Sequence, residues 1–151
     1  MQDVPTLAPG AHLVTPRCGY FHHGIYVGDG KVVHYAGYCG AHHLGPVEEV
    51  AIATFAAGQP VWINPGPRPK YASPEVVRRA RSRLNENSYR LLTNNCEHFC
   101  AWCLSGENRS DQVQAWRLNP RAALCKAVQI FRAYHAKTPA QGQCNAAALP
   151  E

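Results

Sequence analysis

The chain has 151 residues, of which 46% are hydrophobic and 17% charged, so it can bury one core, and a largely disordered chain is excluded. Fifteen Lys and Arg against ten Asp and Glu give a formal net charge of +5, which favours anionic partners without choosing between phospholipid and nucleic acid. The longest uncharged run, 51–67, is broken by glycine and proline, so no membrane-spanning helix is predicted.

The first part of the chain has the pattern of β-strands. Residues 11–16 are predicted to form a strand, and an Asp-Gly turn joins two β-rich runs, 25–28 and 32–35, into a hairpin. We expect pairing across this turn to bring Tyr26 opposite Val33.

Glycine and proline then interrupt the pattern. Residues 37–46 are predicted to be a loop, and 47–50 and 60–64 to be strands. A short helix or strand is expected between these two strands, ending at Phe55, and 65–69 breaks the chain.

Three helices are predicted in the second half. The run Ser-Pro-Glu at 73–75 supplies a capping serine, an early proline and an early carboxylate, so a helix begins there. Asn94 or Asn95 can cap a second helix that runs through Leu104. The third is amphipathic and spans about 119–136.

Strands followed by helices predict an α+β fold rather than a βαβ winding. A single domain is expected over residues 1–136. Residues 137–151 carry no periodic pattern and are expected to be a loose tail.

Seven cysteines are an odd number, and no basic stretch followed by an apolar one marks a secretory signal, so reduced thiols are predicted. Cys96 lies at the start of a predicted helix, where the positive end of the helix dipole lowers a thiol pKa and favours the nucleophilic thiolate. A cysteine enzyme also needs a base and a group that orients this base.

The hairpin offers histidines for both tasks. His22 or His23 leads into its first strand, and His34 lies in its second. Because alternate strand residues point to opposite faces, only one of His22 and His23 can face the helix with Cys96, and the pattern leaves this choice open.

Ordinary packing and metal binding are the alternatives. A lone cysteine or strand histidine is more often part of a core than of a catalytic site. Cys96, Cys100 and Cys103 with His98 have the composition of a zinc site, but His98 lies off the helix side that the cysteines share, and a second Cys-x-x-Cys pair is missing. No metal and no cofactor are therefore predicted.

Two segments resemble a known family. The run HHGIYVGDG at 22–30, followed by VVHY at 32–35, is similar to the histidine box of lecithin:retinol acyltransferase-like (LRAT domain) proteins, and NCEHF at 95–99 is similar to their cysteine box. The boxes occur in the family's order, and the resemblance covers roughly residues 8–118. It implies a circularly permuted papain-like fold of the NlpC type, with an antiparallel sheet that carries the histidines and packs on the helix starting at Cys96.

The resemblance also implies a role for each matching residue. Cys96 would be the nucleophile that takes an acyl group as a thioester, His22 the base, and His34 the group that orients and polarises the base. The family pattern thus selects His22. Tyr20 and Asn95 are expected to support the site, with the backbone N–H of Cys96 as a donor to the oxyanion.

The implied activity is a thiol-dependent phospholipid acyltransferase and phospholipase A1/A2. The implied partners are a glycerophospholipid and an acyl acceptor, which is water, an amine or a lysolipid, with peripheral contact to an anionic membrane; nucleic acid is not expected. The expected location is the cytoplasm, with peripheral membrane contact. A cysteine amidase or peptidase of the same fold and a non-catalytic interaction module are the alternatives, and the pattern predicts no oligomeric state.

Overall fold

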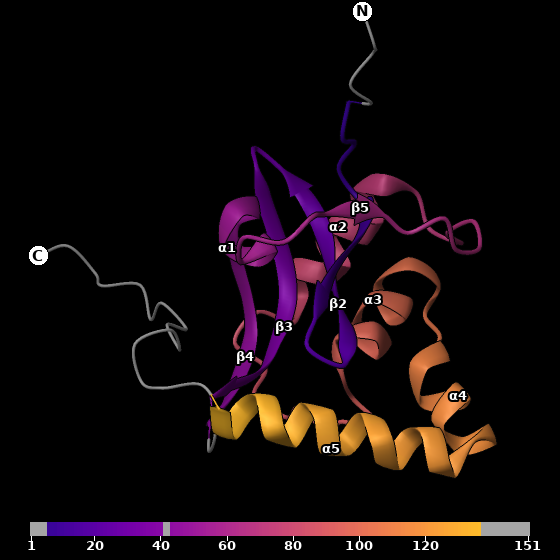
Figure 1. Ribbon diagram of the computed structural model, residues 1–151. Helices are drawn as coiled ribbons and strands as arrows, with labels where there is room; N and C mark the ends of the chain where they lie inside the picture. Colours follow the sequence, from indigo (N-terminus) through magenta and orange to yellow (C-terminus); the bar gives the residue numbers. More distant parts are fainter. Residues whose placement is uncertain (1–5, 41–42, 137–151) are drawn as a thin grey trace, which may run out of the picture.

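The structure is a computed structural model that describes residues 6–40 and 43–136 (Figure 1). One antiparallel sheet has the strand order β4-β3-β2-β1-β5. Its strands are β1 (His12–Arg17), β2 (Tyr20–Gly28), β3 (Lys31–Gly40), β4 (His43–Ala51) and β5 (Trp62–Ile63). The helices are α1 (Ile52–Ala56), α2 (Ser73–Ser82), α3 (Cys96–Ser105), α4 (Asp111–Leu118) and α5 (Pro120–Ala136). The α+β class and the antiparallel sheet are confirmed, whereas the permuted papain-like topology stays a prediction.

The Asp-Gly hairpin forms as predicted, but its register differs from the expected one. Gly28 pairs with Lys31, and a bulge between Tyr26 and Gly28 then shifts the pairing, so that Tyr26 lies opposite Val32 rather than Val33. A bulge puts one extra residue into one strand and therefore changes every later pair.

The predicted loop at 37–46 is wrong for most of its length. β3 continues to Gly40, and β4 begins at His43. Gly37 accounts for part of this difference, because it has a φ of 65° and leaves room for the Tyr89 ring, which would lie 2.8 Å from an added Cβ. At this position the glycine lets β3 continue past the Tyr89 ring, so it does not end the strand.

The other predicted elements of the first half are present with different lengths. The strands expected at 11–16 and 47–50 are β1 and β4, and the segment ending near Phe55 is the helix α1. The strand expected at 60–64 is reduced to the two residues of β5. This short strand pairs with β1 at the sheet edge.

The predicted helices are confirmed, with two differences. α2 has Ala72 as its N-cap, and Ser73 is its first helical residue, so the serine makes no capping hydrogen bond. α4 was not predicted, and its N-cap is Ser110, whose side chain accepts the N–H of Val113. The tail expected at 137–151 lies outside the described residues.

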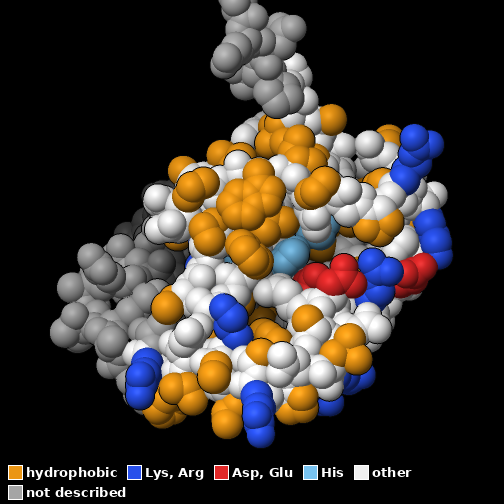
Figure 2. Space-filling model, turned by 45° about the vertical axis from the view of Figure 1, so that its right-hand side comes forward, with side chains coloured by type: hydrophobic (Ala, Val, Ile, Leu, Met, Phe, Trp, Pro, Cys, Tyr) orange, Lys and Arg blue, Asp and Glu red, His pale blue; other side chains and the backbone are white. Residues whose placement is uncertain are grey.

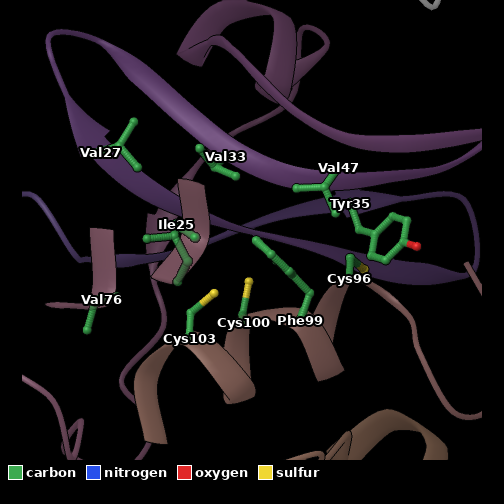
Figure 3. Packing of buried hydrophobic residues seen from close by; sticks show 11 residues of the cluster. Ile25, Val27, Val33, Tyr35, Val47, Val76, Cys96, Phe99, Cys100 and Cys103 are labelled. Carbon is green, nitrogen blue, oxygen red and sulfur yellow. The ribbon is translucent and has the colours of Figure 1, made fainter. Parts of the chain in front are cut away.

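The two faces of the sheet are covered by different helices. Figure 3 shows side chains of β2 and β3 pointing toward α3. The cluster on this face contains Ile25, Val27, Val33, Tyr35, Val47, Val76, Ala80, Cys96, Phe99, Cys100 and Cys103. The opposite face packs Leu13 and Val32 against Phe55 of α1. An added Cβ at Gly24 would lie 2.8 Å from Phe55, so this glycine lets α1 approach β2 closely.

Candidate active site

Cys96 is the first residue of α3, whose start is held by a reciprocal cap. The Asn95 side chain accepts the N–H groups of Glu97 and His98 at 3.0 Å each, and the ring of His98 accepts the N–H of Asn95. Asn95, rather than Asn94, is therefore the cap. The Cys96 side chain is turned toward the sheet and is 3% exposed, and the backbone N–H of His23 donates to its sulfur.

Burial decides the protonation state of this thiol. Burial raises the pKa of Cys96 to about 12, and the backbone N–H groups of His23 and Glu97 offset only part of this rise. The sequence predicted a lowered pKa from the helix dipole. The expectation is wrong for this conformation because a fully buried sulfur loses more hydration than the helix start restores.

His22 and His34 form a buried imidazole pair. His22 Nε2 and His34 Nδ1 are 2.8 Å apart, and Glu48 Oε1 lies 3.1 Å from His34 Nε2, off the line of a hydrogen bond. With the His34 proton on Nε2, toward Glu48, His34 Nδ1 accepts from His22, and His22 Nδ1 is left as the basic nitrogen. Burial, together with the charges of His34 and Arg17, lowers the pKa of His22 well below its usual value, so the ring is neutral near pH 7.

The imidazole pair and Cys96 belong to opposite faces of the sheet. The rings of His22 and His34 lie against Phe55 of α1, with centroids 5.4 Å and 5.6 Å from its ring. Cys96 instead packs in the cluster on the α3 face and contacts β2 through the backbone of His23. Among the described residues, no hydrogen bond joins the Cys96 sulfur to either ring of the pair. The structure thus brings His22 and His34 together. It places Cys96 against the backbone of His23, which is the residue next to His22 on β2.

Strand alternation turns the His23 side chain to the face that looks toward α3. His23 Nδ1 lies 2.9 Å from His12 Nε2, and His23 Nε2 lies 3.1 Å from the Gln112 amide nitrogen. Asn64 approaches the other nitrogen of His12 at 3.2 Å. Burial lowers the pKa of His12 to about 3 and that of His23 to about 4, so both rings are neutral. The sequence analysis did not include His12.

Gln112 and Glu97 connect β2, α3 and α4 at the site, and the sequence analysis assigned a role to neither of them. The Gln112 amide accepts the N–H of Phe21 at 3.1 Å and donates to its C=O at 3.2 Å, as a paired strand would. The Glu97 carboxylate accepts the Ser110 hydroxyl and the N–H groups of Asp111 and Gln112 at the start of α4. Because Glu97 follows Cys96 and Phe21 precedes His22, these contacts set the position of α3 relative to β2. The Ser-Asp pair at 110–111 was a helix-cap signal that could have revealed α4.

A small cavity of about 20 Å³ opens over Cys96. It is lined by Tyr20, Phe21, Tyr89, Leu91, Asn95, Cys96, Gln112, Trp116 and Ile130. Tyr20 and Asn95 therefore share this cavity with Cys96, while their roles stay a prediction.

A larger cavity of about 390 Å³ lies between the segment after β5 and α3. His12, Asn64 and Glu97 contribute to its lining, and Arg68 and Lys70 belong to its basic residues. On the face in Figure 2, histidine side chains are visible at a hollow between a hydrophobic patch and a row of acidic and basic side chains. In the part of the chain that the structure describes, no group of three or more His, Cys, Asp or Glu is arranged to hold a metal ion.

Comparison with known proteins identifies the family. The family model described as Lecithin retinol acyltransferase matches residues 5–109, and the chain belongs to this family. Phospholipase A and acyltransferase 2 of Homo sapiens is 35% identical over 113 residues, covering 64% of this chain and 70% of that protein. Lecithin retinol acyltransferase of Homo sapiens is 31% identical over 149 residues, covering 81% of this chain and 61% of that protein. Lecithin retinol acyltransferase of Mus musculus is 28% identical over 139 residues, covering 74% of this chain and 60% of that protein.

The chain thus spans about 60% of the length of these two lecithin retinol acyltransferases. None of the helices described here has the length and apolar character needed to cross a bilayer.

Proposed function

We propose that this chain is a phospholipid acyltransferase and phospholipase A that works through a thioester on Cys96. The main support is a capped helix start that holds Cys96 against β2, the strand that also carries His22 of the buried imidazole pair, in a chain of this family. The names of the relatives, which describe phospholipase A and acyltransferase activities, agree with this substrate class.

In the proposed reaction, His22 Nδ1 accepts the thiol proton while the Cys96 sulfur attacks the ester carbonyl of the phospholipid. Proton transfer accompanies attack because the resting thiol, with a pKa of about 12, holds its proton. The backbone N–H of Cys96 stabilises the oxyanion at the start of α3. Collapse expels the lysophospholipid alkoxide, which takes the proton from His22, and the acyl group stays on sulfur.

The second half of the reaction frees the enzyme. Water, an amine or a lysolipid attacks the thioester and gives its proton to His22, and the sulfur leaves as the thiol. His34, supported by Glu48, holds the His22 ring and stabilises its protonated form. For this proton transfer, the Cys96 thiol and the His22 ring have to come into contact near the start of β2. The pairing of β2 with β3 ends at Gly24 and does not extend to this part of β2.

The proposal is tested by intact-protein mass spectrometry after incubation with a mixed-chain phosphatidylcholine. We expect an added acyl mass that maps to Cys96 and is absent from Cys96→Ala, with release of lysolipid. Lysolipid release by folded Cys96→Ala would contradict the mechanism. No adduct and no lysolipid from a protein whose Cys96 reacts with alkylating agents in the presence of the lipid would favour the amidase or peptidase, and a Cys96 that stays inert in the presence of the lipid would favour the interaction module.

A further inference from the structure

α4 and α5 contribute to the wall of the cavity over Cys96. Trp116 of α4 and Ile130 of α5 both line it, and its volume is about 20 Å³. Sites that hold a small organic ligand have volumes of roughly 300–1,000 Å³. A phospholipid acyl chain therefore does not fit in this cavity while these two helices stay in place.

Beside this cavity, α5 contacts the turn between β1 and β2. An added Cβ at Gly19, in the turn between β1 and β2, would lie 3.0 Å from the Ile130 side chain and 3.6 Å from that of Gln129. Of the α5 side chains from 121 to 132, only Ala123 and Ile130 are partly buried, and the others are exposed. Figure 1 shows the helix lying across one end of the molecule, beside α4.

The exposed side of α5 carries an apolar stripe. Leu124, Val128 and Phe131 are 66%, 40% and 62% exposed, and their spacing of four and three residues places them on one face of the helix. Arg121 and Arg132 lie seven residues before and four residues after Val128, so they border this stripe. An apolar helix face bordered by arginines is the pattern of helices that lie in a membrane interface.

The charge of this region selects the partner. From 112 to 136 the chain carries Arg117, Arg121, Lys126 and Arg132 and no Asp or Glu. Figure 2 shows hydrophobic and basic side chains, and no acidic ones, along the lower edge of the molecule, where Figure 1 places α5. A second copy would bring cations against cations, whereas a lipid surface offers phosphates to the arginines and an apolar layer to the stripe.

We propose that α5 docks on an anionic phospholipid surface through Leu124, Val128, Phe131 and the arginines beside them, and that docking moves α5 off Gly19 and opens the cavity over Cys96. Exposed apolar surface of the stripe gains a nonaqueous environment in this step, and the packing of Ile130 against Gly19 is given up. The docking and the opening stand independently of the reaction, and only the use of the opened cavity by a phospholipid substrate rests on the proposed function.

Docking is tested with vesicles of diether phosphatidylcholine and phosphatidylglycerol, which have no ester for the enzyme to cleave. In sedimentation with these vesicles, Leu124→Ser combined with Phe131→Ser should weaken binding at least about tenfold, because both apolar contacts are lost. Arg121→Gln with Arg132→Gln should also weaken binding. Lys31→Gln with Arg78→Gln removes the same charge far from α5 and should weaken it much less. Equal losses in the two charge pairs, or full binding by the serine variant, would overturn the docking surface.

Opening is tested by the rate at which an alkylating reagent modifies Cys96, mapped by peptide mass to separate it from Cys18 and Cys125. We expect vesicles to raise this rate about tenfold for the wild type and not for the serine variant, as for a population shift toward the open form. Ile130→Ala should raise the rate without vesicles. A membrane-bound protein whose Cys96 reacts no faster would overturn the opening.

These readouts also separate the two proposals. Vesicle-dependent alkylation in a protein that never forms an acyl adduct would leave the docking and opening intact and remove the proposed function. Efficient acylation by a monomeric short-chain phosphatidylcholine, with no vesicle effect on alkylation, would do the reverse.

Discussion

The Cys96 thiol lies where two opposing influences meet. The capped start of α3 and the N–H of His23 favour a thiolate, and burial against the sheet favours the thiol. Burial prevails and raises the pKa of Cys96 to about 12. The resting site is therefore unreactive, and it becomes a nucleophile only when a neighbouring base takes its proton during attack or when the cavity opens to water.

The choice between adjacent histidines is the first prediction at this scale. Under the proposed mechanism, His22→Gln should lower kcat by at least about a hundredfold, the usual contribution of a general base. His23→Gln should retain a larger share of kcat, because the His23 ring bonds to His12 and Gln112 and not to His34. Lysolipid release by the two variants, with circular dichroism to confirm folding, checks this. If only His23→Gln abolished release, His23 would be the base.

Gly24 supplies a second prediction. An added Cβ would lie 2.6 Å from Val32 and 2.8 Å from Phe55, so Gly24→Ala should push α1 off the sheet and lower the free energy of unfolding by about 1–3 kcal/mol. Gly66→Ala is the matched control, because its nearest neighbour would be 3.5 Å away. Urea unfolding of both variants measures the difference. Equal midpoints would show that the contact between α1 and β2 yields at little cost.

At the scale of elements, α3 and α4 are joined through one carboxylate. Glu97 accepts the Ser110 hydroxyl and two N–H groups in the first turn of α4. Such a turn has donors without partners inside the helix, and a buried anion satisfies them. Gln112, on that same turn, then binds the backbone of Phe21 at the start of β2. The position of His22 thus depends on α4, a helix that is far from β2 in the sequence.

Glu97→Gln should weaken the contact between α3 and α4. The new amide replaces one acceptor oxygen with a donor that faces other donors, which should cost about 1–3 kcal/mol of unfolding free energy. Hydrogen exchange of the α4 amides should accelerate more than that of the α2 amides. Glu75→Gln is the control, since Glu75 is a partly exposed carboxylate in the first turn of α2 that pairs with Arg78. Unchanged exchange in α4 would mean that Ser110 alone holds the helix.

At the scale of the whole molecule, buried neutral histidines make stability depend on pH. Burial lowers the pKa of His12 to about 3 and that of His23 to about 4 from an ordinary value of 6.5. The unfolded chain therefore binds more protons than the folded one below pH 6.5. Their contribution to stability is complete above that pH and is lost as the pH falls toward 4 and 3.

Between pH 6 and 4.5, each of these histidines should cost up to about 1.4 kcal/mol of unfolding free energy per pH unit. Urea midpoints measured from pH 7.5 to 4.5 check this, and they should begin to fall below about pH 6.5. The carboxylates with lowered pKa values, which are Glu49, Glu75, Glu86 and Glu107, contribute only at lower pH. A constant midpoint down to pH 4.5 would show that the histidines are hydrated or protonated in the folded protein.

Local signals in the sequence determined much of the fold. The Asp-Gly turn, the asparagine before Cys96 and the Asn-Pro step before α5 each act within a few residues, so the hairpin and the starts of α3 and α5 could be read directly. The two boxes identified the family, because their residue types and order are specific even without a structure. The choice of His22 and His34 came from the family resemblance and not from the strand pattern, and nitrogens of the two rings do lie 2.8 Å apart.

Contacts between distant segments were decided only by the tertiary structure. The bulge at Tyr26 changed the register of the hairpin, and burial reversed the expected pKa shift of Cys96. Three other features join segments that are far apart in the chain. The His23 ring contacts Gln112, the Gln112 side chain bonds to the backbone of β2, and Ile130 lines the cavity over Cys96. A pattern of neighbouring residues contains no signal for such contacts, because desolvation and packing depend on what the whole fold brings together.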